Sequence, residues 1–226
     1  MKVALISDIH SNLEALERTL QEISERDIQD IYCLGDIVGY GADPNACIDR
    51  VREVAKKSIA GNHDFAVVGL TSTQYFNSYA QAAIRWTQQQ LTEANRVYLK
   101  NMPLTCRRDD MFCVHATPTN PDKWDYIFSR EEAERHFAAF EGSICFIGHS
   151  HIPAYFVSKD STRRFINIGS IGQPRDRDPR LSFAIYDTDT AEVERIRLEY
   201  DIEKTAAKIR SAGLPDFLAE RLLWGM

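Results

Sequence analysis

The sequence contains no apolar stretch near the roughly 18 residues that a membrane-spanning helix needs. Its first apolar run, Val3–Ile6, has only four residues before Ser7 and Asp8. A secretory leader needs a longer apolar segment, of roughly 7 to 15 residues. We therefore expect a cytoplasmic protein that does not enter a membrane.

Cysteine is scarce and follows no recognisable spacing. The chain has five cysteines, an odd number, and no two of them form a C-x-x-C pair. Several stand inside apolar runs typical of strands, which suits reduced, buried thiols better than disulfides or thiolate metal ligands. The five are Cys33, Cys47, Cys106, Cys113 and Cys145.

Basic residues are fewer than acidic ones. The chain has 27 Lys and Arg and 33 Asp and Glu, which gives a net charge of -6. Such a chain lacks the overall positive field with which proteins bind extended nucleic acid. A local positive pocket is still compatible with this balance. We therefore expect a small anionic substrate and no extended nucleic-acid binding.

The chain is long enough, at 226 residues with 44% hydrophobic side chains, to bury a full core in one α/β domain over residues 1–226. Strands and helices alternate at first, which predicts parallel strand pairing. Either Ser11 or Asn12 is the expected cap of the first helix. The expected strands cover 2–7, 31–34 and 58–60, and the expected helices cover 13–23 and 45–54.

The pattern is wholly helical from about 71 to 101, with apolar side chains on one face and a second helix after Thr92. We interpret this segment as a helical cap beside the functional site. Beyond Pro103, strand-like runs follow, and we expect them to form a second, mixed or antiparallel sheet. These runs cover 104–107, 111–115, 144–147, 154–157, 164–168, 181–186 and 192–198.

Two closing helices are expected after Asp201. The apolar residues at 222–224 fit packing on the same chain or on a second copy. The sequence therefore does not decide the oligomeric state.

Five of the six histidines stand in or beside short blocks with Asp, Asn or another His, and each block follows an apolar run. Such blocks at strand ends would meet at one edge of a parallel sheet, where α/β folds place their sites. The pattern predicts a metal centre assembled from distant parts of the chain. The blocks are Asp8-Ile9-His10, Gly35-Asp36, Gly61-Asn62-His63-Asp64, Val114-His115 and Gly148-His149-Ser150-His151. His136 matches none of them and is interpreted as a surface residue.

The donor types indicate which metals and which chemistry to expect. Oxygen and nitrogen donors without thiolates are typical of Mn²⁺, Fe²⁺ or Zn²⁺ sites. Two divalent ions bring four positive charges, from which Asp8, Asp36 and a bridging hydroxide subtract three, so the centre keeps about +1 and attracts a phosphate. Phosphoryl transfer is therefore favoured over amide hydrolysis.

In order and spacing, these blocks resemble the five motifs of the calcineurin-like metallophosphoesterases. The segments 35–45 and 167–176 look most like the small bacterial phosphodiesterase and phosphatase branch of that superfamily. The resemblance implies a four-layer α/β/β/α sandwich of two mixed sheets. It also implies two divalent cations, with Mn²⁺ expected and iron, zinc or nickel as alternatives.

Roles for individual residues follow from the same resemblance. His63 would donate a proton to the leaving oxygen while a hydroxide that bridges the two cations attacks phosphorus. The implied ligands of one cation are Asp8, His10, Asp36 and His151, and those of the other are Asp36, Asn62, His115 and His149.

Members of that branch act as phosphodiesterases, dinucleoside polyphosphate hydrolases or protein phosphatases. In eukaryotic-type Ser/Thr phosphatases the second motif continues with Asp and Arg, where this chain has Gly39 and Tyr40. We therefore expect a phosphodiester or nucleotide polyphosphate as substrate. A protein Ser/Thr phosphatase is the alternative, followed by a non-catalytic scaffold of the same fold. Asp64 is the residue expected to orient His63 in place of the missing Asp.

Two residues outside the motifs are candidates for substrate binding. Arg175 follows Gly169-Ser170 and could contact a substrate phosphate, although an Arg-Asp-Arg-Asp run is often a self-paired surface. Trp124, with Tyr126 nearby, follows His115 and could either stack on a nucleobase or pack inside the protein.

Overall fold

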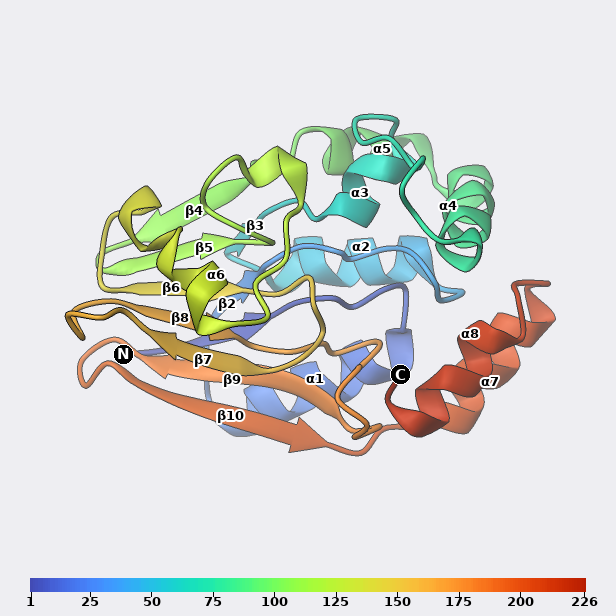
Figure 1. The fold of residues 1–226 in the computed structure, drawn as a ribbon. Coiled ribbons are helices and arrows are strands. Elements are labelled where there is room, and N and C mark those ends of the chain that lie inside the picture. Colours follow the sequence, from blue (N-terminus) through green and yellow to red (C-terminus); the bar gives the residue numbers. More distant parts are fainter.

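Two five-stranded mixed sheets form the centre of the molecule in the computed structural model, which describes residues 1–226 (Figure 1). The predicted α/β sandwich of two mixed sheets is confirmed. The first sheet has the order β10-β9-β1-β2-β3 and the second the order β4-β5-β6-β8-β7. The strands are β1 (Lys2–Ile6), β2 (Asp30–Cys33), β3 (Lys57–Ser58), β4 (Thr105–Arg108), β5 (Met111–Val114), β6 (Ile144–Ile147), β7 (Ala154–Val157), β8 (Arg164–Asn167), β9 (Leu181–Asp187) and β10 (Glu192–Leu198).

The predicted parallel pairing of the first strands is confirmed, since β1 pairs with β2 and β2 with β3 in parallel. The expectation that every strand after Pro103 belongs to the second sheet is wrong for two strands. β9 returns to pair antiparallel with β1, and β10 pairs antiparallel with β9. β9 is buried along almost its whole length, which suits a strand between two neighbours, whereas β10 is mostly exposed or half-buried and forms the edge.

Side chains of each strand alternate between two layers of core. In β1, Val3 and Leu5 pack in the core between the two sheets, whereas Ala4 and Ile6 pack under the helices on the outer face of the first sheet. Full burial of one such Leu side chain stabilises the fold by about 1.5–3 kcal/mol. The alternation therefore fixes which way each strand faces, and with it the direction of the loop that follows.

Helices cover the outer face of the first sheet, and each begins at a recognisable signal. The side chain of Asn12 accepts a hydrogen bond from the backbone N–H of Ala15, so Asn12 is the cap of α1 (Leu13–Glu25). α2 (Pro44–Val54) has a proline in its first turn. The remaining elements are α3 (Asn62–Val67), α4 (Ser78–Gln90), α5 (Glu93–Lys100), α6 (Arg130–Glu134), α7 (Ile202–Ser211), α8 (Phe217–Glu220) and the 3-10 turns η1 (Pro121–Lys123), η2 (Phe137–Ala139) and η3 (Arg221–Trp224).

The fourth layer consists of shorter helices than those that cover the first sheet. The outer face of the second sheet is covered by α6, η2 and the chain around them, through an apolar cluster that includes Ile127, Ala133 and Phe137 above Cys145 and Phe165. The short elements leave the chain between β5 and β6 largely irregular. Part of that irregular chain extends to the edge of the sheets where the histidines lie.

The stretch expected to be helical from 71 to 101 contains α4 and α5, but its first part is not helical. Residues 68–77 are turns and irregular chain, and α4 begins only after Asn77, whose side chain caps it by accepting a hydrogen bond from the N–H of Ala80. The second helix begins after Thr92, as predicted. The predicted helical stretch therefore began too early. A single capping residue hardly disturbs the apolar pattern, so the pattern alone does not mark where the helix begins.

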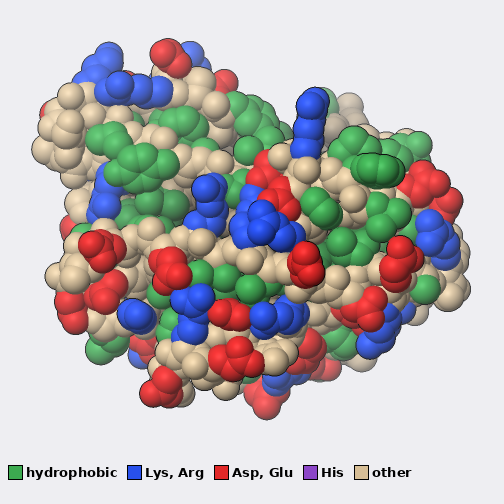
Figure 2. All heavy atoms as spheres, turned by 90° about the horizontal axis from the view of Figure 1, so that it is seen from below, with side chains coloured by type: hydrophobic (Ala, Val, Ile, Leu, Met, Phe, Trp, Pro, Cys, Tyr) green, Lys and Arg blue, Asp and Glu red, His purple; other side chains and the backbone are tan.

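The C-terminal helices α7 and α8 pack beside α4 (Figure 1). Leu222 is buried in this contact, whereas Trp224 is 64% exposed. No helix of the chain is both long and apolar enough to span a membrane. The face in Figure 2 carries acidic and basic side chains interspersed with one another, without an extended area of one sign.

Candidate metal centre

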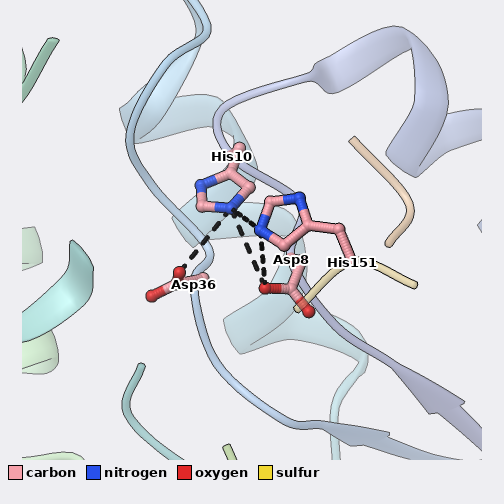
Figure 3. Close-up of side chains that lie close together, drawn as sticks. All are labelled: Asp8, His10, Asp36 and His151. Atoms are coloured by element: carbon pink, nitrogen blue, oxygen red, sulfur yellow. Dashed lines mark hydrogen bonds and ion pairs between the residues drawn. The ribbon is translucent and has the colours of Figure 1, made fainter. Parts of the chain in front are cut away.

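The predicted blocks meet beyond the carboxyl ends of β1, β2, β5 and β6. Asp8 and His10 follow β1, Asp36 follows β2, and His151 follows β6. Ligand atoms of these four buried residues lie within 4.8 Å of one another (Figure 3). His151 Nε2 is 3.2 Å from Asp8 Oδ1, and His10 Nε2 is 3.6 Å from Asp36 Oδ2. The structure therefore brings together the four residues of the first predicted set.

A second group shares Asp36 with the first. Ligand atoms of Asp36, His115 and His149 also lie within 4.8 Å of one another. His115 Nε2 is 3.4 Å from Asp36 Oδ2. Asn62, at the start of α3, is buried, and its Oδ1 has no hydrogen-bond partner. One carboxylate thus stands between two clusters of donors.

The histidines of both groups are held by the backbone. In each ring one nitrogen is paired with a main-chain oxygen, so an N–H sits on that side, and the other nitrogen presents a lone pair whenever the ring is neutral. These bonds run from His10 Nδ1 to Val38 O (3.0 Å), from His115 Nδ1 to Leu34 O (2.8 Å), from His151 Nδ1 to Gln173 O (2.6 Å) and from His149 Nε2 to Trp124 O (2.8 Å).

In this arrangement, hydrogen-bond acceptors face one another with no donor between them. His10 Nε2 and His151 Nε2 are 3.1 Å apart. Burial holds the pKa of both rings well below the ordinary value, so both are neutral and both lone pairs face the same point. Asp8 Oδ1 and His115 Nε2 are also buried without a hydrogen-bond partner. Each such atom costs about 1–3 kcal/mol unless something satisfies it.

A divalent cation in each group would satisfy these atoms, since oxygen and imidazole donors suit such ions. The charges agree with this fit. Burial raises the pKa of Asp8 to about 6, and the nearby Asp36 adds to the shift. Burial opposes protonation of His115, but the Asp36 and Asp8 carboxylates and the Leu34 carbonyl together outweigh it and raise the pKa of His115 to about 9. A proton on His115 is what a cation would displace. The residues present therefore fit divalent metal ions.

Five of the seven candidate ligands have left-handed backbone conformations, which non-glycine residues seldom adopt. Each such residue costs about 1–3 kcal/mol and persists only where its surroundings hold it. The backbone is thus bent just after β1, β2 and β6, where these side chains turn inward. The five are Asp8 (φ 54), His10 (φ 51), Asp36 (φ 52), His149 (φ 66) and His151 (φ 61).

Asp64 does not orient His63, contrary to the sequence-based expectation. Its carboxylate accepts hydrogen bonds from the backbone N–H groups of Ile37 (2.9 Å), Val38 (3.2 Å) and Gly61 (3.0 Å). It therefore ties the loop after Asp36 to the turn before α3. A carboxylate engaged by three N–H groups has no free lone pair well placed for the ring.

His63 lies beside the two groups and differs from the four histidines in them, because neither of its ring nitrogens is paired with a main-chain oxygen and its Nδ1 is buried without a partner. Its ring packs between Tyr40 (4.6 Å between ring centroids) and Phe76 (5.1 Å). Burial lowers its pKa to about 4. A Cβ atom at Gly39, which has a φ of +104°, would lie 2.5 Å from His63 Nδ1. An Asp at position 39 would therefore collide with the ring in this backbone.

A pocket of about 260 Å³ opens over His63 and His149. Two cationic side chains, Arg175 and Lys123, and five aromatic ones stand in its wall. The complete lining is Tyr40, Asn62, His63, Thr71, Ser72, Tyr75, Phe76, Asn77, Ala80, Lys123, Trp124, Tyr126, His149 and Arg175. Of these, Thr71, Ser72, Asn77 and Lys123 had no signal in the sequence, because they stand in turns that no motif marks.

Arg175 is turned towards this pocket rather than paired on the surface. Its Nη2 donates to Gln173 Oε1 (2.9 Å) and to Tyr40 Oη (3.3 Å), and its Nε is buried without a partner. The acids that follow it are taken by other cations, since Asp176 pairs with Arg197 and Asp178 with Arg180. Arg175 is therefore available to an anion in the pocket.

Trp124 both packs and lines the pocket. Its indole N–H donates to Thr71 Oγ1 (3.1 Å), and its ring meets that of Phe65 edge to face. Tyr126 stacks on the ring of His149, with 4.1 Å between centroids. The remaining histidine, His136, is half-buried just before η2 and belongs to neither group.

Comparison with known proteins assigns a family to this geometry. Residues 1–191 match the family model described as the calcineurin-like phosphoesterase superfamily domain. The uncharacterised protein MJ0912 of Methanocaldococcus jannaschii is 40% identical over 242 residues, which cover 99% of this chain and 98% of that protein. Phosphodiesterase YfcE of Escherichia coli is 27% identical over 204 residues, 85% of this chain and 91% of that protein.

Among solved structures, a metallophosphoesterase from Sphaerobacter thermophilus superposes with a TM-score of 0.91 at 39% identity, and the match covers 100% of this chain and 99% of that one. The hypothetical protein PH1004 from Pyrococcus horikoshii superposes with a TM-score of 0.88 at 23% identity, over 100% and 98% of the two chains. The second likeness shows the same fold.

Proposed function

Since this chain belongs to the calcineurin-like phosphoesterase superfamily and is a phosphate-ester hydrolase, we propose that it cleaves a phosphodiester or a nucleotide polyphosphate with two divalent cations. The observation that carries this proposal is the shared carboxylate: Asp36 stands in both clusters of donors. A centre built this way fits a pair of ions, because one carboxylate has two oxygens.

The two cations would be held by the residues of the two groups. Asp8, His10, Asp36 and His151 would bind one, and Asp36, Asn62, His115 and His149 the other. The donor set of carboxylate, amide and imidazole suits Mn²⁺, which is the cation we expect. When bound, the cations supply Lewis acidity, which activates water and neutralises charge on the phosphate oxygens.

His63 would supply the proton that the leaving oxygen needs. With a pKa of about 4 the ring is neutral at pH 7 in the substrate-free protein. An anionic phosphate beside it would raise that pKa and allow the ring to take up a proton. The ring nitrogen farther from Gly39, Nε2, is the one we assign to this transfer, while Tyr40 and Phe76 hold the ring plane.

The pocket suits the part of the substrate that lies next to the cleaved bond. Its volume of about 260 Å³ is below that of sites for drug-sized ligands, which begin near 300 Å³. Arg175 would bind a phosphate oxygen, and Trp124 would contact the group attached to it. The start of the segment 71–101 supplies six of the lining residues, which supports its role as a cap. The name of the Escherichia coli relative, phosphodiesterase, supports a diester.

Product analysis tests this function directly. Mn²⁺-loaded protein would be incubated in parallel with a bis-aryl phosphodiester, an aryl monoester, diadenosine tetraphosphate and a phosphopeptide, with Asp36→Asn protein as the blank. We expect turnover of the diester or the tetraphosphate well above the blank. Turnover confined to the phosphopeptide would replace the proposal with a protein phosphatase. Metal-bound protein inactive on all four would favour a scaffold.

A further inference from the structure

His149 is anchored differently from the other three histidines of the centre. The carbonyl groups that hold the others belong to Leu34, Val38 and Gln173, which are at most 1% exposed. The carbonyl that holds His149 belongs to Trp124, a half-buried residue in the irregular chain between β5 and β6. The second cluster of donors therefore depends in part on a half-buried loop, whereas the carbonyls that anchor the first are fully buried.

Two residues of this loop hold the His149 ring from different sides. The Trp124 carbonyl accepts the hydrogen bond from Nε2 at 2.8 Å, which leaves Nδ1 as the nitrogen with a free lone pair. The Tyr126 ring lies nearly parallel to the imidazole, at 19° and 4.1 Å between centroids. We call Trp124 and Tyr126 the clamp. Together they fix both the tautomer and the plane of the ring.

The backbone of the clamp is not in a conformation that the loop would choose by itself. Trp124 has a φ of 59° and Asn120, four residues earlier, a φ of 51°. Left-handed geometry at a residue as bulky as Trp is unfavourable and has to be held by contacts elsewhere. One such contact is the hydrogen bond from the indole N–H to Thr71 Oγ1, at 3.1 Å. Thr71 thus helps to fix the position of Trp124, whose carbonyl accepts the hydrogen bond from His149.

We propose that Trp124 and Tyr126 are positioning residues for the cation bound through His149, and that the Thr71–Trp124 hydrogen bond couples the pocket wall to that cation. This inference rests on the proposed dinuclear function. All three residues line the pocket. Loosening the clamp should weaken the binding of one cation and spare that of the other, because the carbonyls that anchor His10 and His151 are buried and form no hydrogen bond with the clamp.

The affinity of the protein for Mn²⁺ alone tests the inference without substrate. Isothermal titration of metal-free protein measures the two binding constants, and electron paramagnetic resonance distinguishes an isolated Mn²⁺ from a coupled pair. In Thr71→Val, which removes the hydroxyl, and in Tyr126→Leu, which removes the stacked ring, we expect one affinity to fall by about 10-fold to 100-fold, as for other residues that orient a metal ligand. The other affinity should stay unchanged.

Matched variants separate positioning from general loss of structure. Thr71→Ser keeps the hydroxyl and should restore the wild-type affinity. Thr73→Val makes the same change as Thr71→Val two residues away, at a side chain outside the pocket lining. Tyr155→Leu matches Tyr126→Leu at a tyrosine on β7 that is 57% exposed. Both controls should bind Mn²⁺ as the wild type does.

The results separate the two proposals. Two wild-type affinities that remain unchanged in Thr71→Val and Tyr126→Leu would overturn the clamp and leave the dinuclear function standing. A fall of both affinities together, or an equal fall in Thr73→Val, would also overturn it, because the effect would not be specific to His149. Wild-type protein that binds fewer than two Mn²⁺ would overturn the dinuclear function and the clamp with it.

Discussion

The metal centre and the pocket above it are built in opposite ways. Candidate ligands of the centre are at most 7% exposed, and the histidines among them donate to main-chain oxygens. The pocket wall comes largely from turns, and Tyr75 and Tyr126 in it are 90% and 45% exposed. Buried, backbone-held donors suit ions that must not move, whereas a wall of turn residues can change without disturbing the core, except where Thr71, Trp124 and Tyr126 connect it to His149. The comparison predicts that changes in the centre act on catalysis and that changes in the rest of the wall act on substrate binding.

Asp36→Asn should have the largest effect, because it alters the one residue common to both clusters. We expect kcat to fall by at least roughly three powers of ten, since the amide removes a negative charge that both cations need. Steady-state turnover and metal content by mass spectrometry check this. The same substitution at Asp109, which is exposed in the β4–β5 turn, serves as the control. An Asp36→Asn enzyme within tenfold of wild type would place the reaction elsewhere.

His63→Ala should come next, and it separates proton transfer from metal binding. Loss of a general acid typically costs about 10²-fold to 10⁴-fold in rate. The variant should still bind two Mn²⁺, because His63 belongs to neither cluster of donors. Turnover and Mn²⁺ titration measured on the same preparation decide between the two roles, with His136→Ala as the control. Loss of a cation along with activity would make His63 a ligand instead.

Gly39→Ala tests how tightly the centre is packed against His63. The added methyl group would lie 2.5 Å from His63 Nδ1 and would displace the ring, so kcat should fall by about tenfold, as for a misplaced catalytic group. Gly69→Ala is the matched control, since Gly69 also has a positive φ (+79°) but nothing within 4 Å of its added Cβ. Both variants should lose about 1–2 kcal/mol of unfolding free energy from the backbone alone. Equal kcat in the two variants would contradict the steric account.

Arg175→Gln should have the smallest effect on kcat and should act on KM instead. Because Arg175 lies in the pocket wall, its loss should raise KM by roughly tenfold and change kcat little. Arg177→Gln, at an exposed position two residues away, should leave both constants unchanged. A drop in kcat with constant KM would show that Arg175 stabilises the transition state. It would contradict the assignment of catalysis to the centre and of substrate binding to the wall.

The centre was more predictable from the sequence than the wall, and the reason is local. Strands of parallel sheets end at one edge, so motifs that follow β1, β2, β5 and β6 converge once those strands are recognised. The fold class and the ends of β6, β7 and β10 were predictable for the same reason, because alternation marks each strand by itself. Asp8 and His151 therefore meet although they are far apart in the chain.

Long-range choices were not predictable. Nothing local in 181–187 distinguishes a strand of the second sheet from one that returns to β1, because pairing depends on which edge is open. The left-handed backbone at Asp36 and the carbonyl of Trp124 that holds His149 carry no side-chain signal. Asp64 was misassigned because the N–H groups that engage it belong to the main chain. Tertiary contacts set the backbone geometry, whereas a sequence motif shows only which side chains are present. Features that depend on the backbone are therefore not predictable from motifs.

Anomalous diffraction from crystals grown with Mn²⁺ tests the central claim most directly, since it locates the ions without reference to activity. The account predicts two peaks that share Asp36, one also ligated by Asp8, His10 and His151 and the other by Asn62, His115 and His149. A single peak, or two peaks that do not share Asp36, would contradict it.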